Sequence, residues 1–346
     1  MTADTLHLPD APALPGLAFR RFRGEVDYPN MLAVLQGSKA ADGIEDADTL
    51  ERVSHNYAHL NNCDPFQDMV FAEANCQVVG YGRTWWFRDS AGLVIYAHFG
   101  MLLPHWRRMG IGRAMLHYLE RRAHSTATAG RTRPDGRQSF YQGAAWETEI
   151  GKIRLLESEG YTPVRNFYEM VRLELDNIPY APLPVSLEVR PAAPEHYRAI
   201  WEANVEAFRD HWSEEERTET DYERWLGGDE FAPDIWKVAW DGDQVAGMVL
   251  GYIDEAQNAT YKRKRGWTEN ICVRRPWRKR GLARALIAEN LRELRARGMT
   301  EAALGVDTEN PTGALRVYES MGFRAVKREV LYRKAMSESD SVKRDA

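Results

Sequence analysis

The second half of the chain alternates between two hydrophobic periods. Residues 187–192 (LEVRPA) alternate apolar and polar positions, which predicts a first strand. Residues 194–208 carry apolar side chains at helical spacing, which predicts a helix. Residues 236–253 alternate again around Asp241-Gly242, a pair typical of a tight turn, and so predict a hairpin.

The same pattern continues to the end of the chain. It predicts a strand at 269–274, a helix from Gly281 to Arg297, a strand at 302–307, a helix from Thr312 to Met321 and a last strand at 328–334. The first half gives the same order: a hairpin at 68–86, a strand at 92–103, a helix at 110–124, and then strand, helix and strand. We therefore expect an α/β fold with mixed twisted sheets flanked by helices.

The two halves also share short phrases at long, similar offsets. The phrase HWRRMGIGRA at 105–114 matches RPWRKRGLAR at 275–284, and further glycine pairs lie 167 and 162 positions apart. The matched pairs are Trp106 and Trp277, Arg107 and Arg278, Gly110 and Gly281, Gly80 and Gly247, and Gly160 and Gly322. Two repeats are too few for a solenoid, so two copies of one domain are the better interpretation.

The length of 346 residues agrees with two domains. The proline-rich segment 177–186 is the predicted linker, because proline ends helices and favours extended chain. The predicted organisation is an N-terminal extension (1–16), a first domain (17–176), a second domain (187–335) and a disordered tail (336–346).

Composition narrows the functional classes. The net charge of −5 argues against a general nucleic-acid binder, which needs an excess of cations. The three cysteines, Cys63, Cys76 and Cys272, lie far apart and form no disulfide framework, so a reducing cytoplasm is the expected compartment. No apolar run is long enough for a membrane span.

Residues 275–284 place five cations around Gly281 and Ala283, directly before a predicted helix. Small residues let backbone N–H groups approach an anion closely, and the helix turns its positive end toward it. The loop is therefore predicted to hold an anion.

This arrangement of strand, R-x-x-G-x-G/A and helix resembles motif A of the GNAT acetyltransferase superfamily. In the family the anion is the pyrophosphate of coenzyme A. The resemblance implies cofactor binding by the second loop, at Arg278, Lys279, Arg280, Gly281, Leu282 and Ala283. The first copy fits the same motif at Arg107, Gly110 and Gly112.

Residues 305–323 resemble the family's motif B, complete at Asn310, Ala314, Tyr318, Gly322 and Phe323. The resemblance implies that Asn310 bonds the pantetheine arm and that Tyr318 protonates the departing thiolate; the alternative for Tyr318 is a core aromatic. In the first copy, Thr148 stands in place of the asparagine and Leu156 in place of the tyrosine. Leucine cannot donate a proton, so one working site is expected, in the C-terminal domain.

A base is needed because only an unprotonated amine attacks a thioester. In the superfamily a Glu or His on the fourth strand often serves, and Glu269 occupies that strand, with His98 as its counterpart. A solvated residue at a strand start is the alternative for Glu269; Asp307 and Glu309 are further candidate carboxylates.

The backbone of Ile271, Cys272 and Val273 is expected to line the pantetheine arm and to polarise the thioester carbonyl. A nucleophilic Cys272 is the competing interpretation, but a cysteine in an apolar strand is more often inert.

Asp210, His211 and Trp212 lie in the helical region that borders the acceptor pocket in the family, and are candidate substrate ligands. Core aromatics plus a helix cap are the alternative. The basic run 262–265 is interpreted as a solvated hairpin tip.

Together these features predict a tandem N-acetyltransferase that uses acetyl-CoA, without a metal, to acetylate a primary amine of a small molecule. The candidate acceptors are aminosugars, aminoglycosides, polyamines and cysteinyl-sugars; the last class is the one suggested by other two-copy members of the family. A non-enzymatic acyl-CoA-binding or regulatory protein and a protein N-acetyltransferase are the alternatives. A monomer or a homodimer is expected.

Overall fold

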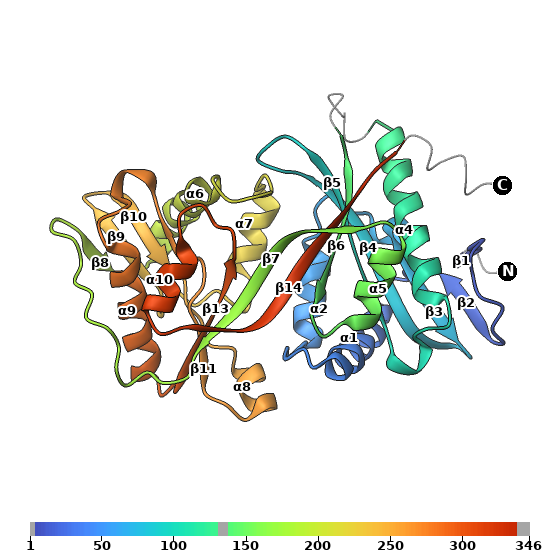
Figure 1. Ribbon diagram of the computed structural model, residues 1–346, viewed down its shortest axis with the longest axis horizontal. Helices are drawn as coiled ribbons and strands as arrows, with labels where there is room; N and C mark the ends of the chain where they lie inside the picture. Colours follow the sequence, from blue (N-terminus) through green and yellow to red (C-terminus); the bar gives the residue numbers. More distant parts are fainter. Residues whose placement is uncertain (1–3, 131–137, 338–346) are drawn as a thin grey trace. The chain divides into compact units, whose positions relative to one another are not determined.

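The structure, a computed structural model, describes residues 4–130 and 138–337. The chain forms two compact units (Figure 1). Unit 1 comprises Met1–Val164 together with Val330–Ala346, and unit 2 comprises Arg165–Glu329. Unit 1 is thus completed by residues from the end of the chain. The domain bounds given above, with a linker at 177–186, stay a prediction.

Unit 1 is built on one mixed sheet. Its strands follow the order β1 (Thr5–Leu6), β2 (Leu17–Arg20), β3 (Met69–Ala74), β4 (Gln77–Arg88), β5 (Val94–Leu102), β6 (Phe140–Trp146) and the end of β14 (Arg324–Ala335). Pairing is antiparallel from β1 to β5, whereas β5 and β6 are parallel. Asn75 and Cys76 both have positive φ, as the tight turn between β3 and β4 requires.

Helices cover both faces of the unit 1 sheet. On one side α1 (Tyr28–Asp42) packs on β4 and β5 and against α2 (Leu50–Ala58); α3 (Pro65–Asp68) leads into β3. On the other side α4 (Ile111–Thr128) packs on β3, β4 and β5, and α5 (Ile150–Ser158) packs on β6. Two short 3-10 turns, η1 (Glu25–Asp27) and η2 (Pro104–Trp106), precede α1 and α4.

Unit 2 divides its strands between two sheets. One is antiparallel, in the order β12 (Cys272–Val273), β10 (Gln244–Val249), β9 (Lys237–Asp241) and β8 (Glu188–Arg190). In the other, β11 (Arg265–Trp267) runs parallel to β13 (Glu301–Asp307), which is antiparallel to β7 (Thr162–Arg172). The start of β14 lies next to β7. The strand expected at 269–274 is therefore short, because Asn270 has a φ of +48° and kinks the chain.

The helices of unit 2 are α6 (Tyr197–Phe208) after η3 (Pro194–His196), α7 (Glu219–Leu226), α8 (Glu255–Tyr261), α9 (Leu282–Ala296) after η4 (Arg275–Trp277), and α10 (Ala314–Ser320). The three helices predicted for the second half are present in unit 2 as α6, α9 and α10, and α7 and α8 are additional. Helix α9 packs on β9, β10 and β12 and buries Leu286, Leu291 and Leu294 completely. The expectation of mixed α/β sheets flanked by helices is confirmed.

The solvated tip predicted at 262–265 holds for Lys262 and Lys264, which are exposed between the end of α8 and β11, but it is wrong for Arg265. Arg265 is buried and forms ion pairs with Glu301 at 2.7 Å and Glu169 at 3.2 Å. The last residue of the basic run therefore belongs to the interior of unit 2.

A buried hydrogen bond holds α9 to the end of β11. Thr268 and Asn290 are fully buried, and the Thr268 hydroxyl donates to Asn290 Oδ1 at 2.9 Å. Thr268→Val removes the donor and leaves a buried acceptor, which costs about 1–3 kcal/mol. We expect the melting temperature to fall by about 2–4 °C for each kcal/mol lost. Thr300→Val, at an exposed position, is the control. Equal melting temperatures for the two variants would show that the pair contributes nothing.

Candidate active site

The candidate site of unit 2 lies where the chain passes from one sheet to the other. β11 pairs with β13 from Arg265 to Trp267, and the Thr268 N–H continues this pairing to Ala303 O at 2.8 Å. On its other edge the chain bonds the continuation of β10 before Asn270, through Trp267 with Tyr252 and through Glu269 O with the Leu250 N–H, and after Asn270 β12 pairs with β10 itself. The backbones of β12 and β13 therefore separate after Thr268, and polar groups of β13 are left facing the opening.

Glu269 stands at the start of this opening. Its Oε1 accepts a hydrogen bond from the Gly305 N–H at 2.8 Å. Burial raises the pKa of Glu269 to about 8; the charges of Glu230 and Glu169 add to this, and the N–H groups of Gly305 and Asn270 oppose it. A carboxyl group with a pKa near neutrality can exchange a proton with a reacting group.

Tyr318 is the second group at the opening. It is a buried residue of α10, with only 7% of its surface exposed. Burial, followed by the charges of Glu269 and Cys272, raises the pKa of its hydroxyl well above the usual range. The structure thus brings Tyr318, Glu269 and Cys272 together, and it keeps the tyrosine protonated at neutral pH.

Cys272 is a buried residue of β12. Burial raises the pKa of its thiol to about 12, although the backbone N–H of Met248 and nearby arginines oppose the shift. A thiol that stays protonated is a poor nucleophile. Its neighbours Ile271 and Val273 are half-buried and contact the apolar core beneath α9.

The predicted anion loop connects η4 to α9. Lys279 and Gly281 have φ values of +63° and +85°, and Gly281 is the N-cap of α9. No side chain in the described part of the chain caps this helix. A β-carbon at Gly281 would meet no described atom within 4 Å. The start of α9 therefore has no side-chain cap and has free space at the β-carbon position of Gly281, as an anion site at a helix N-terminus requires.

Arg278 fixes this loop rather than projecting from it. Its Nε donates to Val273 O at 2.9 Å, Nη1 donates to Asp210 at 2.7 Å, and Nη2 donates to Ala207 O at 3.3 Å. Asp210 also pairs with Arg275. Hydrogen bonds from Arg275 and Arg278 hold the pKa of Asp210 far below its usual range. The acceptor role predicted for Asp210 stays a prediction, and its carboxylate already has two guanidinium partners.

His211, which follows α6, lies close to Asn310 in the turn before α10. His211 Nε2 lies 3.4 Å from Asn310 Nδ2, and burial lowers the pKa of the imidazole. Asn310 Oδ1 accepts from the Thr312 N–H and hydroxyl, so this side chain orders the turn before α10. Trp212 lies 5.3 Å from the Arg165 guanidinium, which pairs with Asp307 at 2.8 Å.

The first copy repeats the arginine but not the open site. Arg107 Nε donates to Leu102 O at 2.9 Å, and its guanidinium pairs with Asp42 and Ser38. Gly110, with φ of +90°, is the N-cap of α4. A β-carbon on Gly112 would lie 3.6 Å from Leu155. Leu156, in the place of Tyr318, is buried in the core.

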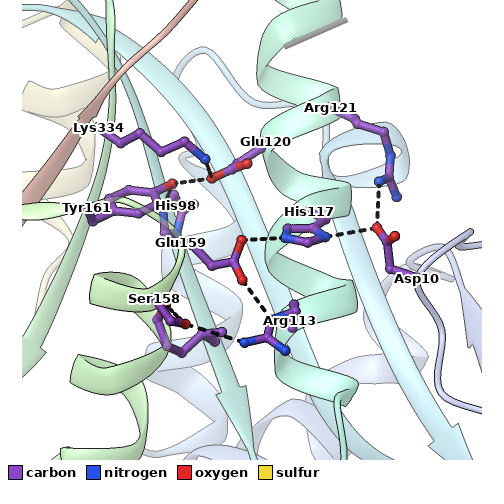
Figure 2. Close-up of polar contacts among 11 residues, drawn as sticks. Asp10, His98, Arg113, His117, Glu120, Arg121, Ser158, Glu159, Tyr161 and Lys334 are labelled. Carbon is purple, nitrogen blue, oxygen red and sulfur yellow. Dashed lines mark hydrogen bonds and ion pairs between the residues drawn. The ribbon is translucent and has the colours of Figure 1, made fainter. Parts of the chain in front are cut away.

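His98, the counterpart of Glu269, belongs to a closed network. Its Nε2 lies 2.9 Å from the Tyr161 hydroxyl, which donates to Glu120 Oε1 at 2.9 Å; Lys334 donates to the same oxygen at 2.8 Å (Figure 2). Burial lowers the pKa of His98 to about 4, so the ring is neutral at pH 7. These side chains fill the place that is open in unit 2.

Sequence reasoning missed the carboxylates that hold the two arginines. Asp42 and Asp210 lie 168 positions apart, each just after or at the end of the first long helix of its copy. The repeat alignment could have found them. No sequence signal marks Arg165 as the partner of Asp307, because the pair spans β7 and β13.

Three features of unit 2 are typical of acyl-transfer proteins that bind a phosphate-bearing cofactor. They are the separation of β12 from β13, the glycine loop at a helix N-terminus, and the pair Glu269 and Tyr318. The acetyltransferase (GNAT) family pattern matches residues 38–141 and 197–323. The chain belongs to this family, and it carries two copies of the domain.

Known proteins are similar to this chain over most of its length. A mycothiol acetyltransferase of Thermobifida fusca is 28% identical over 87% of this chain and 93% of its own length. One from Geodermatophilus obscurus is 26% identical over 88% and 93%. A GCN5-related N-acetyltransferase of Sphaerobacter thermophilus has a TM-score of 0.69, 28% identity and coverage of 93% and 96%. A tandem GNAT protein of the clavulanic acid biosynthesis pathway, 15% identical with a TM-score of 0.63, shares the fold.

Arg278→Lys tests the loop. Arg278 donates from three different nitrogens of its planar guanidinium to Val273, Asp210 and Ala207. Lysine has a single nitrogen and cannot reach all three partners, so the loop becomes less rigid. We expect the KM for acetyl-CoA to rise about tenfold, which is about 1.4 kcal/mol, with a smaller change in kcat. Arg107→Lys makes the matched change in unit 1 and leaves both constants unchanged. A larger effect from Arg107→Lys would place the cofactor in unit 1.

Glu269→Gln tests the base. Because its pKa is raised to about 8, Glu269 is mostly protonated at pH 7 and becomes a carboxylate as pH rises through 8. We expect kcat/KM of the wild type to rise with pH over this range. The variant should lose about 10²–10⁴-fold in kcat and also lose this limb of the profile. A variant that keeps the limb would assign it to another group.

Proposed function

We propose that unit 2 transfers the acetyl group of acetyl-CoA directly to a primary amine of a small molecule. The observation that supports the proposal is that Glu269, bonded to the Gly305 N–H where β12 and β13 separate, acts electrostatically on the buried Tyr318 hydroxyl, in a unit whose α9 begins at an uncapped Gly281. A base, an acid and an anion cradle are the three parts that acetyl transfer from a thioester requires.

The cofactor fits the loop through backbone groups. N–H groups at the start of α9 would bind the pyrophosphate, and Lys279 and Arg280, both exposed, would add positive charge. The backbone of Ile271 to Val273 would line the pantetheine arm, and Asn310 would bond it. Acetyl-CoA would supply the activated acetyl group.

The residues then have separate roles in the transfer. The amine nitrogen attacks the thioester carbonyl carbon, and Glu269 takes the proton that the nitrogen loses. The C–S bond breaks, and the Tyr318 hydroxyl gives its proton to the departing thiolate. The raised pKa of Glu269 supports its role, because this carboxyl group can bind a proton near neutral pH. Burial keeps the Tyr318 hydroxyl protonated, so it carries a proton when the C–S bond breaks.

The acceptor is a small molecule with a cationic amine. The charge of Glu230 contributes to the raised pKa of Glu269 and would favour a positive charge near it, whereas Glu169 is already paired with Arg265. The relatives named mycothiol acetyltransferases support a cysteinyl-sugar amine within this class. His211 and Trp212 are the proposed contacts beyond the carboxylates.

We keep the compartment and the oligomeric state that the sequence predicts as part of the proposal. Its cysteines are free, which agrees with the reducing cytoplasm proposed for it. No helix in residues 4–130 and 138–337 has the length and apolar character needed to cross a membrane. We propose a monomer or a homodimer.

Tyr318→Phe separates an enzyme from a binding protein. We expect acetyl-CoA to bind with unchanged Kd in calorimetry, and kcat to fall about 10²–10⁴-fold, because the thiolate leaves without a proton. The assay follows free CoA thiol with cysteinyl-sugar, aminoglycoside and polyamine acceptors. Gly281→Asp should weaken binding tenfold or more, whereas Gly110→Asp, with the same backbone strain, should not. Binding by the wild type without turnover of any amine would favour an acyl-CoA-binding protein.

A further inference from the structure

The two copies differ at the glycine that begins the helix after each loop. Gly110 and Gly281 have nearly the same φ, +90° and +85°. At Gly281 an added β-carbon would meet no described atom within 4 Å, but at Gly110 it would meet the Pro12 ring at 3.4 and 3.6 Å. The N-terminal segment Leu8–Leu14 thus lies over the first loop.

This segment, named the lid here, is anchored in unit 1. Leu8 is 2% exposed and belongs to the core cluster that contains Ile111 and Met115 of α4, against which Leu14 also packs. Two turn hydrogen bonds, Ala11 N–H to Leu8 O at 3.0 Å and Leu14 N–H to Pro12 O at 2.9 Å, keep it compact. The lid is therefore an ordered part of unit 1.

A histidine on α4 connects the lid to the end of α5. His117 Nδ1 lies 2.9 Å from Asp10, on the lid, and Nε2 lies 2.7 Å from Glu159, just after α5 (Figure 2). Arg121 also contacts Asp10, at 3.3 Å, and Arg113 contacts Glu159 at 2.7 Å. Only an imidazolium can donate to a carboxylate from both nitrogens, so this geometry fits the charged ring.

The charges of the carboxylates agree with that state. The hydrogen bond from His117 is the main cause that lowers the pKa of Asp10. Burial acts to raise the pKa of Glu159, but hydrogen bonds from His117 and Arg113 outweigh it, and the net shift is downward. Both carboxylates are therefore ionised at neutral pH.

The second copy has no counterpart of this connection. Ala288 stands at the place of His117 and Met321 at the place of Glu159, and both are buried in the apolar core of unit 2. The His117 cluster is thus a feature of the first copy alone, and so is the covered loop.

We propose that the lid, Leu8–Leu14, is a resident occupant of the first copy's anion loop, held there by the His117 imidazolium, and that it limits the protein to one CoA per chain. The inference rests on the proposed function of the second loop as a CoA site. In this proposal the lid closes the anion loop of the first copy. That loop would bind CoA once the lid is displaced.

Calorimetry with CoA and hydrogen exchange of the lid test the proposal at pH 6. The wild type should bind one CoA, and Gly281→Asp should abolish it. Asp10→Ala and His117→Ala should speed exchange in residues 8–14 about tenfold and add a second, weaker CoA equivalent, which Gly110→Asp removes in the same background. Glu25→Ala, an exposed charge elsewhere in unit 1, should do neither. Turnover at unit 2 should be unchanged in all three.

Two results would overturn the lid. One is a second CoA equivalent in the wild type that Gly110→Asp removes. The other is a variant whose residues 8–14 exchange fast but which still binds one CoA. Exchange that is equal in the wild type and His117→Ala would overturn the role of the histidine. Failure of the proposed function is distinguishable, since CoA binding would then be missing throughout or insensitive to Gly281→Asp.

Discussion

The end of one strand pairing shapes the candidate site of unit 2. After Thr268 the chain stops pairing with β13, whereas its other edge, already bonded to Leu250 and Tyr252, goes on to pair with β10. Gly305 N–H then lacks a strand partner on that side, and the Glu269 carboxyl group takes its place. The half-buried position of the Glu269 carboxyl group follows from this local break in the sheet.

The two arginines show what the copies share. Each guanidinium binds a carbonyl of the preceding strand and an aspartate at the end of the first helix, so each joins strand, helix and loop. Arginine suits this role because its fork donates in several fixed directions. The scaffold of the loop is therefore common to both units, whereas the groups that could react differ: a carboxyl and a tyrosine in one, a locked histidine and a leucine in the other.

The periodicity of the chain predicted most elements because each copy is locally consistent. Strand and helix patterns from 187 to 334 reappear in the structure. The repeated glycines occupy matching places in both copies: Gly80 and Gly247 lie in strands, and the pairs 110/281 and 160/322 have positive φ. The kink at Asn270 carried no pattern, and it shortened a strand expected at 269–274. Arg265 was misread because a charged run is usually solvated, while its partners Glu169 and Glu301 lie far away in sequence.

The same limit applies to the candidate site. Motifs indicated Glu269, Tyr318 and Gly281, because their chemistry sits in short, fixed spacings. The partners of Arg278 and the contacts of Leu8–Leu14 depend on tertiary packing across tens of residues, which spacing does not encode. The sequence therefore predicted both loops, but it did not predict that Leu8–Leu14 covers one of them and leaves the other uncovered.

The composition of unit 1 has a consequence for synthesis of the chain. Its sheet ends with residues 330–335, which lie next to β6, and Lys334 is part of the buried network around Glu120. A ribosome makes these residues more than 160 positions after Val164, so the first unit cannot finish its sheet while it emerges. Unit 1 therefore cannot fold completely as it leaves the ribosome, as the first domain of a chain usually does. Although unit 1 is translated first, its sheet is completed last.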